Sequence, residues 1–389
     1  MSRNEIRKGD TPLKEIYLDN SSTTKVCREA ADKAYQMMTE RYGNPSSLHT
    51  LGFAAEREMQ QAREQIARSM SVRPEEITFT SGGTEADNIA VFGAAFQKRK
   101  QGNRIVTTAI EHPAVLEPVR RLEQEGFEVV YLQPDEEGHI RPEQIREAID
   151  NRTILVSMML VNNDVGTILP VEEAARAIAR AKAPALLHVD AVQAYGKIPV
   201  RPQKLGADLV TVSAHKIHGP KGIGALYQAK TSHIPARTFG GGQEKNLRPG
   251  TESTPLIAAF GEAVRVLPEL SAQREKIAAL NRICRDGLGD IPGIVINSPE
   301  DALEYVLNFS TGSVRSETML HFLASKGIYV SSGSACSKAK PSHVLAAMGL
   351  DSRRIDTAIR VSFSRENTED DVRALLDALA EGMASLARK

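Results

Sequence analysis

The feature that most constrains the fold is a regular alternation of short apolar runs with helical stretches over the first two-thirds of the chain. Several runs are apolar almost throughout, which is typical of strands buried on both faces. The stretches between them, such as Glu85–Lys100 and Val171–Lys182, have helical spacing. This alternation predicts an α/β fold, with a mostly parallel seven-stranded sheet and helices on both faces. The candidate strands are Glu76–Ser81, Ile105–Ile110, Phe127–Leu132, Thr153–Val161, Leu186–Ala191, Asp208–Ala214 and Gly224–Tyr227.

The last third of the chain has a different pattern. A long helical stretch, Pro255–Gly289, is interrupted near Pro268, and shorter strands and helices follow it. We therefore expect two domains. The large domain would cover residues 16–254, and a smaller α+β domain would combine residues 1–15 with residues 255–389.

The final helix is the clearest in the chain. Thr368 precedes it and Asp371 stands three residues further on, which resembles a capping box with Asp in place of the usual Glu. The apolar residues that follow recur at the spacing of one helical face. They are Val372, Leu375, Leu376, Leu379, Met383 and Leu386.

Charge and cysteine content exclude several classes of function. Lys and Arg together number 49, as do Asp and Glu, and a net charge of zero argues against nucleic-acid or membrane binding. The three cysteines lack CxxC spacing, so neither a zinc ribbon nor a redox dithiol is expected, and no metal site is predicted. Residues 1–10 are polar, without the apolar core of a signal peptide. We expect a cytoplasmic protein.

Residues that follow the candidate strands are candidates for a site, because ligands of open α/β sheets bind at the carboxyl ends of strands. The segment Ser81–Ala86 contains two glycines and leads straight into a helix, whose free N–H groups can cradle a phosphate. Taken alone, this pattern is more typical of a plain strand–turn–helix junction with Thr84 as the N-cap.

Three further strand ends carry ionisable residues. Asp190 ends an apolar strand, where a carboxylate is costly unless paired, and it could serve a metal, a structural arginine or a cofactor. Lys216 follows another strand among histidines and glycines, and such a lysine can form an imine with a carbonyl cofactor, although most lysines are simply exposed. His112 follows a third strand, where a lone histidine is more often a capping or core residue.

The order of these motifs resembles the cysteine desulfurases of the class-V aminotransferase family, from about Ile16 to the C-terminus. The resemblance is closest to the group whose reactive cysteine sits in a long SSGSAC loop, which serves iron–sulfur assembly. It implies the aspartate-aminotransferase-like fold (fold type I) and pyridoxal 5′-phosphate (PLP) as the cofactor. The matching motifs are GNPSSLH (43–49), SGGTEADN (81–88), EHPAV (111–115), VNNDVG (161–166), HVDAVQ (188–193), SAHKIHGPKG (213–222), RPGTE (248–252) and SSGSAC (331–336).

The resemblance assigns the residues around the cofactor ring. It implies that Lys216 forms the covalent link to PLP and later moves the Cα proton. Asp190 would pair with the protonated ring nitrogen, which keeps the ring an electron sink. Gln193 would reach the ring oxygen O3′, and His112 would stack on the ring face and shuttle protons.

The resemblance also implies a phosphate site and a substrate site. It implies that Asn163 lies among the residues that bind the cofactor and also holds the substrate carboxylate together with Arg360. Asn44 would lie nearby. Either Asn162 or Asn163 could face the cofactor, and the spacing to Gly166 favours Asn163. The residues implied to hold the phosphate are Gly83, Thr84, Ser213, His215 and, from the second subunit of a homodimer, Thr251.

Cys336 separates a desulfurase from other PLP enzymes. Its surroundings, SSGSACSKAKPS, bury little and predict a mobile loop, and nearby lysines favour the thiolate. Composition alone leaves an incidental surface cysteine about equally plausible, and the family resemblance favours the nucleophile. Cys27 and Cys284 stand in ordinary helical contexts and are interpreted as structural.

The implied reaction takes sulfur from L-cysteine, releases L-alanine and leaves a persulfide on Cys336. That sulfur would pass to an acceptor, such as an iron–sulfur scaffold or a thiolation protein, which the sequence does not name. Two alternatives on the same fold are a selenocysteine lyase and an aminotransferase. A third is a PLP-bound regulatory protein, against which the intact set of Lys216, Asp190 and Cys336 argues.

Overall fold

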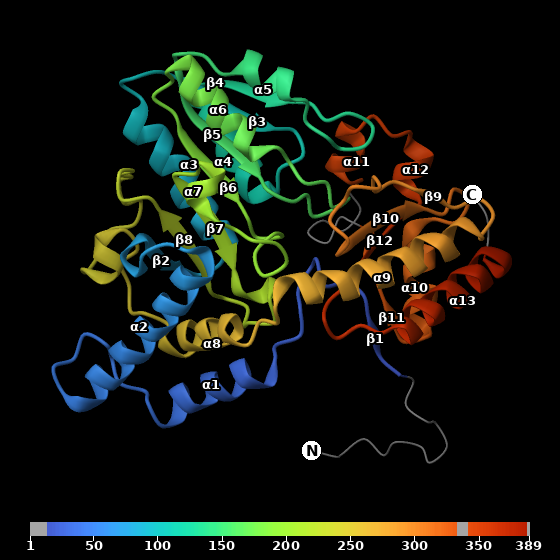
Figure 1. Ribbon diagram of the computed structural model, residues 1–389, viewed down its shortest axis with the longest axis horizontal. Helices are drawn as coiled ribbons and strands as arrows, with labels where there is room; N and C mark the ends of the chain where they lie inside the picture. Colours follow the sequence, from blue (N-terminus) through green and yellow to red (C-terminus); the bar gives the residue numbers. More distant parts are fainter. Residues whose placement is uncertain (1–13, 333–340, 387–389) are drawn as a thin grey trace.

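The computed structural model describes residues 14–332 and 341–386. Its largest sheet has seven strands in the order β2–β8–β7–β6–β5–β3–β4 (Figure 1). β8 runs antiparallel to both neighbours, whereas all other neighbouring pairs are parallel. The mostly parallel seven-stranded sheet expected from the sequence is therefore confirmed. Its strands are β2 (Ile77–Thr80), β3 (Arg104–Thr108), β4 (Glu128–Leu132), β5 (Thr153–Met159), β6 (Leu186–Asp190), β7 (Leu209–Ser213) and β8 (Gly224–Gln228).

Helices cover both faces of this sheet, as the sequence predicts (Figure 1). Leu155 and Val156 of β5 lie in two different apolar clusters, because successive side chains of a strand point to opposite faces. Leu155 packs with α3 and α4, and Val156 belongs to the cluster that holds α5 and α6. These helices are α3 (Gly83–Lys98), α4 (Pro113–Gln124), α5 (Pro142–Ala148) and α6 (Val171–Ala181).

Three further helices form a group beside the sheet, at the lower left of Figure 1. α8 packs against both α1 and α2. The helices are α1 (Arg28–Thr39), α2 (Thr50–Met70) and α8 (Thr254–Arg265), and the remaining short elements of this part are α7 (Pro202–Leu205) and the 3-10 turns η1 (Pro74–Glu76), η2 (Ala214–Lys216) and η3 (Gln243–Asn246).

The C-terminal part contains two small sheets. One is antiparallel, in the order β12–β10–β9, and the other pairs β1 with β11 in parallel. The pairing of β1 with β11 joins the N-terminal segment to this part, while the division at residue 255 stays a prediction. The elements are β1 (Ile16–Tyr17), β9 (Val295–Ile296), β10 (Val306–Ser310), β11 (Ile328–Tyr329), β12 (Ala358–Ser362), α9 (Leu270–Gly289), α10 (Ser316–Ser325), α11 (His343–Ala347), α12 (Ser352–Asp356) and α13 (Glu369–Ser385).

The final helix, α13, begins with the expected capping box. The Asp371 carboxylate accepts from the Thr368 backbone N–H at 3.1 Å, and the Thr368 hydroxyl accepts from the Asp371 N–H at 3.4 Å. Val372, Leu375 and Leu379 are buried against the C-terminal part, as their helical spacing predicts. Of the helices in residues 14–332 and 341–386, none is long and apolar enough to cross a membrane.

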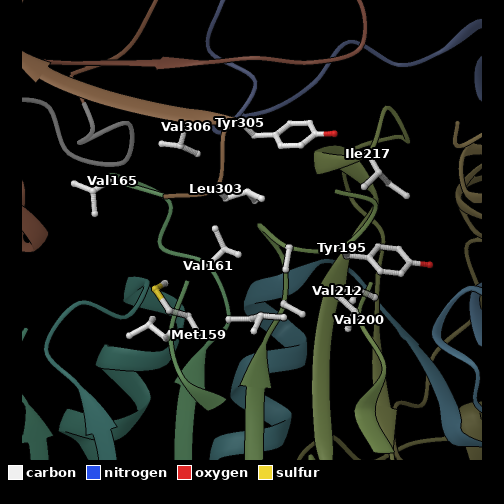
Figure 2. Close-up of a cluster of buried hydrophobic side chains, with 14 of the residues drawn as sticks. Met159, Val161, Val165, Tyr195, Val200, Val212, Ile217, Leu303, Tyr305 and Val306 are labelled. Atoms are coloured by element: carbon white, nitrogen blue, oxygen red, sulfur yellow. The ribbon is translucent and has the colours of Figure 1, made fainter. Parts of the chain in front are cut away.

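A buried apolar cluster joins the carboxyl edge of the large sheet to the C-terminal part (Figure 2). Met159 at the end of β5 and Val161 just beyond it lie on the sheet side of this cluster. Leu303, Tyr305 and Val306, from the segment that leads into β10, lie opposite them. Because interiors pack as densely as organic crystals, this contact fixes where β10 and β12 stand relative to the strand ends.

We expect Leu303→Ala to lower the free energy of unfolding by about 2–5 kcal/mol, the usual cost of truncating a fully buried leucine. Leu303 is 0% exposed, whereas Leu48 is 90% exposed and supplies a matched control. Chemical unfolding should show an earlier midpoint for Leu303→Ala and an unchanged midpoint for Leu48→Ala. Equal midpoints for the two variants would contradict the packing role of this cluster.

Candidate active site

The carboxyl ends of β6 and β7 meet the first turn of α3. These strands are parallel neighbours, with Asp190 paired in register with Thr211. Asp190 is the last residue of β6, and Lys216 ends the η2 turn that follows β7. α3 begins at Gly83, close behind β2. The structure therefore brings three predicted site residues to the edge at which open α/β sheets bind ligands.

The turn between β2 and α3 is shaped to hold an anion. Gly82 is the N-cap of α3 with a φ of 153°, a conformation that favours glycine. A Cβ on Gly83 would lie 3.0 Å from Val192 Cγ2 and 3.8 Å from Ser213 Cβ, so this glycine keeps the turn close to both strand ends. The buried Ser213 hydroxyl has no hydrogen-bond partner among the described residues. It is a free donor beside the helix N-terminus, where Thr84 occupies the first turn.

Asp190 is a buried acid whose surroundings hold few positive charges. Its Oδ1 accepts one hydrogen bond, from the Val192 N–H at 2.9 Å. Burial, followed by the nearby Asp87 carboxylate, raises the pKa of Asp190 to about 7, while Lys216 acts in the opposite direction. A cation placed against this carboxyl would favour its ionised form, so the site suits a protonated ring nitrogen.

Residues 21–24 form the opposite wall of the site. Lys216 Nζ donates to the carbonyl oxygen of Ser22 at 2.9 Å and also to that of Ser21. Gln193 Nε2 donates to the same Ser21 carbonyl at 2.9 Å. This segment does not follow any predicted strand, although the polar run after Leu18, DNSSTT, was a signal that could have identified it.

His215 contacts the same wall. Its Nδ1 lies 3.2 Å from the Thr23 hydroxyl. Burial, followed by the charge of Lys216, lowers the pKa of His215 to about 3, so the imidazole is neutral at physiological pH. Because the Thr23 hydroxyl occupies Nδ1 of His215, Nε2 is the ring nitrogen that can contact a ligand.

His112 is the N-cap of α4, and its Nδ1 accepts from the Ala114 backbone N–H at 3.1 Å. This bond places the proton of the neutral ring on Nε2. Burial, with the charges of Lys216 and His343, lowers the pKa of His112 to about 4. His112 therefore combines the capping role that its position suggests with a place near Lys216.

Arg360 of β12 brings the C-terminal part into the site. Its side chain is 2% exposed, and Nη2 donates to the Ser22 hydroxyl at 2.7 Å and to Asp19 at 3.1 Å. Nη1 donates to the Asn163 carbonyl at 2.9 Å and to Asp164 at 3.3 Å. Because Ser22 contacts both Arg360 and Lys216, a guanidinium and an amine are held side by side.

The structure distinguishes the two adjacent asparagines. Asn162 is buried, its Oδ1 accepts from the N–H groups of Asp164 and Val165, and its Nδ2 donates to the Ile110 carbonyl. Its amide is therefore occupied in shaping the turn. Asn163 is half-buried beside Arg360, and among the described residues its Nδ2 donates to the neighbouring Asp164, so the choice between the two asparagines stays a prediction.

Two predicted residues are not brought to this group, and a third lies outside the described part of the chain. Asn44 is exposed in the segment between α1 and α2, where its Oδ1 accepts from the Ser46 N–H at 2.9 Å. Thr251 is exposed, although its segment contacts α3 through an ion pair between Arg248 and Glu85 at 3.0 Å. Cys336 lies outside the described residues.

Two other findings bear on the chemistry. The two cysteines that the structure describes, Cys27 and Cys284, are both buried and free. Burial raises the pKa of the Cys284 thiol to about 12, which makes it a poor nucleophile. Residues 14–332 and 341–386 contain no group of three or more His, Cys, Asp and Glu side chains that could hold a metal ion.

Solved structures of similar proteins share the whole architecture. A structure titled "NIFS-LIKE PROTEIN" superposes with a TM-score of 0.91 at 39% identity, covering 96% of this chain and 100% of that chain. Another, titled "SspA in complex with cysteine", has a TM-score of 0.79 at 33% identity and covers 90% of this chain and 99% of that chain.

Sequence comparisons agree over the same length. Residues 16–375 match the family model described as aminotransferase class-V. A protein of Clostridium botulinum named "Cysteine desulfurase IscS" is 40% identical over 94% of each chain. A protein of Photobacterium profundum with the same name is 43% identical, covering 92% of this chain and 90% of its own. The resemblance inferred from the motifs is confirmed: the chain belongs to the class-V aminotransferase family, in its group of cysteine desulfurases.

Proposed function

We propose that the protein is a PLP-dependent cysteine desulfurase that takes sulfur from L-cysteine, releases L-alanine and holds the sulfur as a persulfide on Cys336. The observation that carries the proposal is the shared contact at Ser22, which holds Lys216 and Arg360 side by side. An amine next to a buried guanidinium suits an α-amino acid, because the guanidinium can bind the carboxylate while the amine acts at the Cα atom.

The residues present fit PLP. The unpartnered Ser213 hydroxyl and the tight Gly83 turn suit the phosphate, together with Thr84 and His215. Asp190 would pair with the ring nitrogen, and Lys216 would bind the aldehyde carbon. Gln193 would donate to the ring oxygen, and His112 would lie on the ring face. Bound there, PLP supplies an electron sink for negative charge that develops on the substrate.

The side chains of this protein would then bind the substrate, move its protons and accept its sulfur. Arg360 and Asn163 would fix the substrate carboxylate, and Lys216 Nζ would take the Cα proton and return it. Neutral His112, with its proton on Nε2, can donate or relay a proton without adding charge. The Cys336 thiolate would attack the substrate sulfur, so that the substrate Cβ–S bond breaks as the new S–S bond forms. A proton takes the place of sulfur on Cβ, and the product leaves as alanine.

We further propose that the enzyme is a cytoplasmic homodimer that passes its sulfur to an acceptor protein. The exposed positions of Thr251 and Asn44 suit contacts with a second subunit, since neither reaches the Lys216 group within its own chain. The two relatives named IscS support an acceptor in iron–sulfur assembly.

Replacing Cys336 tests the proposed nucleophile. We expect Cys336→Ser to bind L-cysteine, because Arg360 and Lys216 are unchanged, while alanine release falls by at least about a hundredfold since serine is scarcely ionised. Wild-type protein mixed with a small excess of L-cysteine should gain one sulfur, located by mass spectrometry on the peptide that contains Cys336. Full alanine production by Cys336→Ser would favour an aminotransferase-like activity, and far faster turnover of selenocysteine than of cysteine would indicate a lyase.

Asp190 gives a pH-dependent prediction. Its pKa is raised in the folded apoprotein to about 7, so folding takes up a proton and this carboxyl lowers stability increasingly as pH rises from about 4 to 7. Asp190→Asn should therefore stabilise the PLP-free protein by roughly 2–4 kcal/mol at pH 8, with little change at pH 4. The same variant should bind PLP more weakly. A pH-independent effect on thermal unfolding would contradict the burial of an uncompensated acid.

Subunit mixing tests the shared site. Lys216→Ala and Thr251→Ala should each be inactive alone, whereas a heterodimer of the two contains one intact site. Random exchange in an equimolar mixture should then restore about a quarter of wild-type activity, because half of the dimers are mixed and each has one working site. An active monomer in sedimentation, or a mixture no more active than its components, would contradict the prediction.

A further inference from the structure

Lys197 is a buried cation that the proposed mechanism does not use. It lies in the segment after β6 and is 5% exposed, yet within the described part of the chain it forms no ion pair. Its Nζ donates to Gln193 Oε1 at 3.1 Å and stands 5.6 Å from the centroid of the Tyr305 ring. A buried ammonium is costly without a countercharge, so its retention calls for a reason.

The other charged groups around Lys197 add to this cost. Burial, followed by the positive charges of Lys216 and Arg360, lowers the pKa of Lys197 to about 7. The charge of Lys197 in turn depresses the pKa of His215 and of His218. The groups that face Lys197 from η2, β12 and the following turn are therefore cationic or neutral.

The contact with Gln193 determines which way the amide points. A lysine ammonium has only donors, so it must face the amide oxygen and not the amide nitrogen. Gln193 Nε2 is thereby directed to the other side, where it donates to the Ser21 carbonyl that also accepts from Lys216. Without Lys197, the two ends of the Gln193 amide could exchange places.

We propose that Lys197 is a positioning residue, which holds Gln193 by its oxygen so that the Nε2 donor is presented to the ring oxygen of the cofactor. The inference rests on the proposed function, because it requires PLP to bind beside Gln193. Lys197 would therefore affect the cofactor only through Gln193.

The test is a double-mutant cycle on PLP binding at pH 6.5, where Lys197 is charged. Lys197→Met should raise the dissociation constant of PLP about five- to tenfold, the effect of one ordinary hydrogen bond. In a Gln193→Ala background the same change should have less than about a twofold effect, because the group it positions is gone. Lys197→Arg retains charge and donors and should restore most of the affinity.

A second readout is the pH titration of the visible absorption of the PLP-loaded protein. This absorption reports whether the Lys216 nitrogen is protonated. Removing a neighbouring positive charge favours the protonated form, which raises the pKa of that nitrogen. The midpoint should therefore move upward in Lys197→Met, by about half a pH unit or more, and stay near the wild-type value in Lys197→Arg.

Thermal unfolding of the PLP-free proteins separates positioning from misfolding. The lowered pKa means that Lys197 reduces stability most below about pH 7, and that this penalty fades as pH rises toward 10.5. Lys197→Met should accordingly be at least as stable as the wild type at pH 6.5.

The outcomes distinguish the two proposals. Weaker PLP binding that depends on Gln193, together with the shifted midpoint and undiminished stability, supports the role of Lys197. Equal loss of affinity with and without Gln193, or no change in both readouts, overturns that role while the cofactor assignment stands. A wild-type protein that takes up no PLP overturns both.

Discussion

The active site depends on a short segment of backbone that crosses between two parts of the chain. The carbonyl groups of Ser21 and Ser22 accept from Lys216, and the Ser22 hydroxyl accepts from Arg360. These partners come from η2 beside the large sheet and from β12 of the small antiparallel sheet. Since carbonyl and hydroxyl oxygens carry no net charge, this segment can hold an amine and a guanidinium at close range, while Asp19 and Asp164 pair with the guanidinium.

The same region holds more buried ionisable groups than a stable core requires. Asp87 and Asp190 are buried acids whose pKa values are raised to about 7, and burial lowers the pKa of His188, which lies between them in the fold, to about 4. In each case burial disfavours the charged form of the group. The two buried acids lower stability once they ionise, and shifted pKa values of this kind are typical of active sites, where a bound ligand supplies the missing partner. A pyridinium against Asp190 would be such a partner.

Much of this architecture follows from local sequence. The seven strands of the large sheet were predictable because each is a short apolar run between helical stretches, and the α13 capping box was predictable because its two members stand three residues apart. The site residues required the family resemblance, since a strand-end Lys216 or Asp190 has several ordinary explanations. Local sequence gave no indication that β1 pairs with β11, or that β8 runs antiparallel, because strand pairing depends on contacts far apart in the chain.

Lys197 and the wall of residues 21–24 were missed for the same reason. Neither lies at the carboxyl end of a candidate strand, and their importance appears only when Gln193, Lys216 and Arg360 are seen around them.

Arg360 also links the proposed substrate site to the segment that carries Cys336, the proposed nucleophile. Ser331, before that segment, pairs with Arg360 through two backbone hydrogen bonds, and Ser342, after it, donates to Asp164 at 2.6 Å. Asp164 in turn accepts from the Arg360 guanidinium. One described end of the segment is therefore bonded to Arg360, which is proposed to bind the substrate carboxylate, and the other is bonded to the carboxylate partner of Arg360. A substrate carboxylate would meet an arginine already bonded to Asp19 and Asp164, and it must share or displace them. The charge on Asp164 is thus common to substrate binding and to the anchoring of Ser342, so these two events cannot be energetically independent.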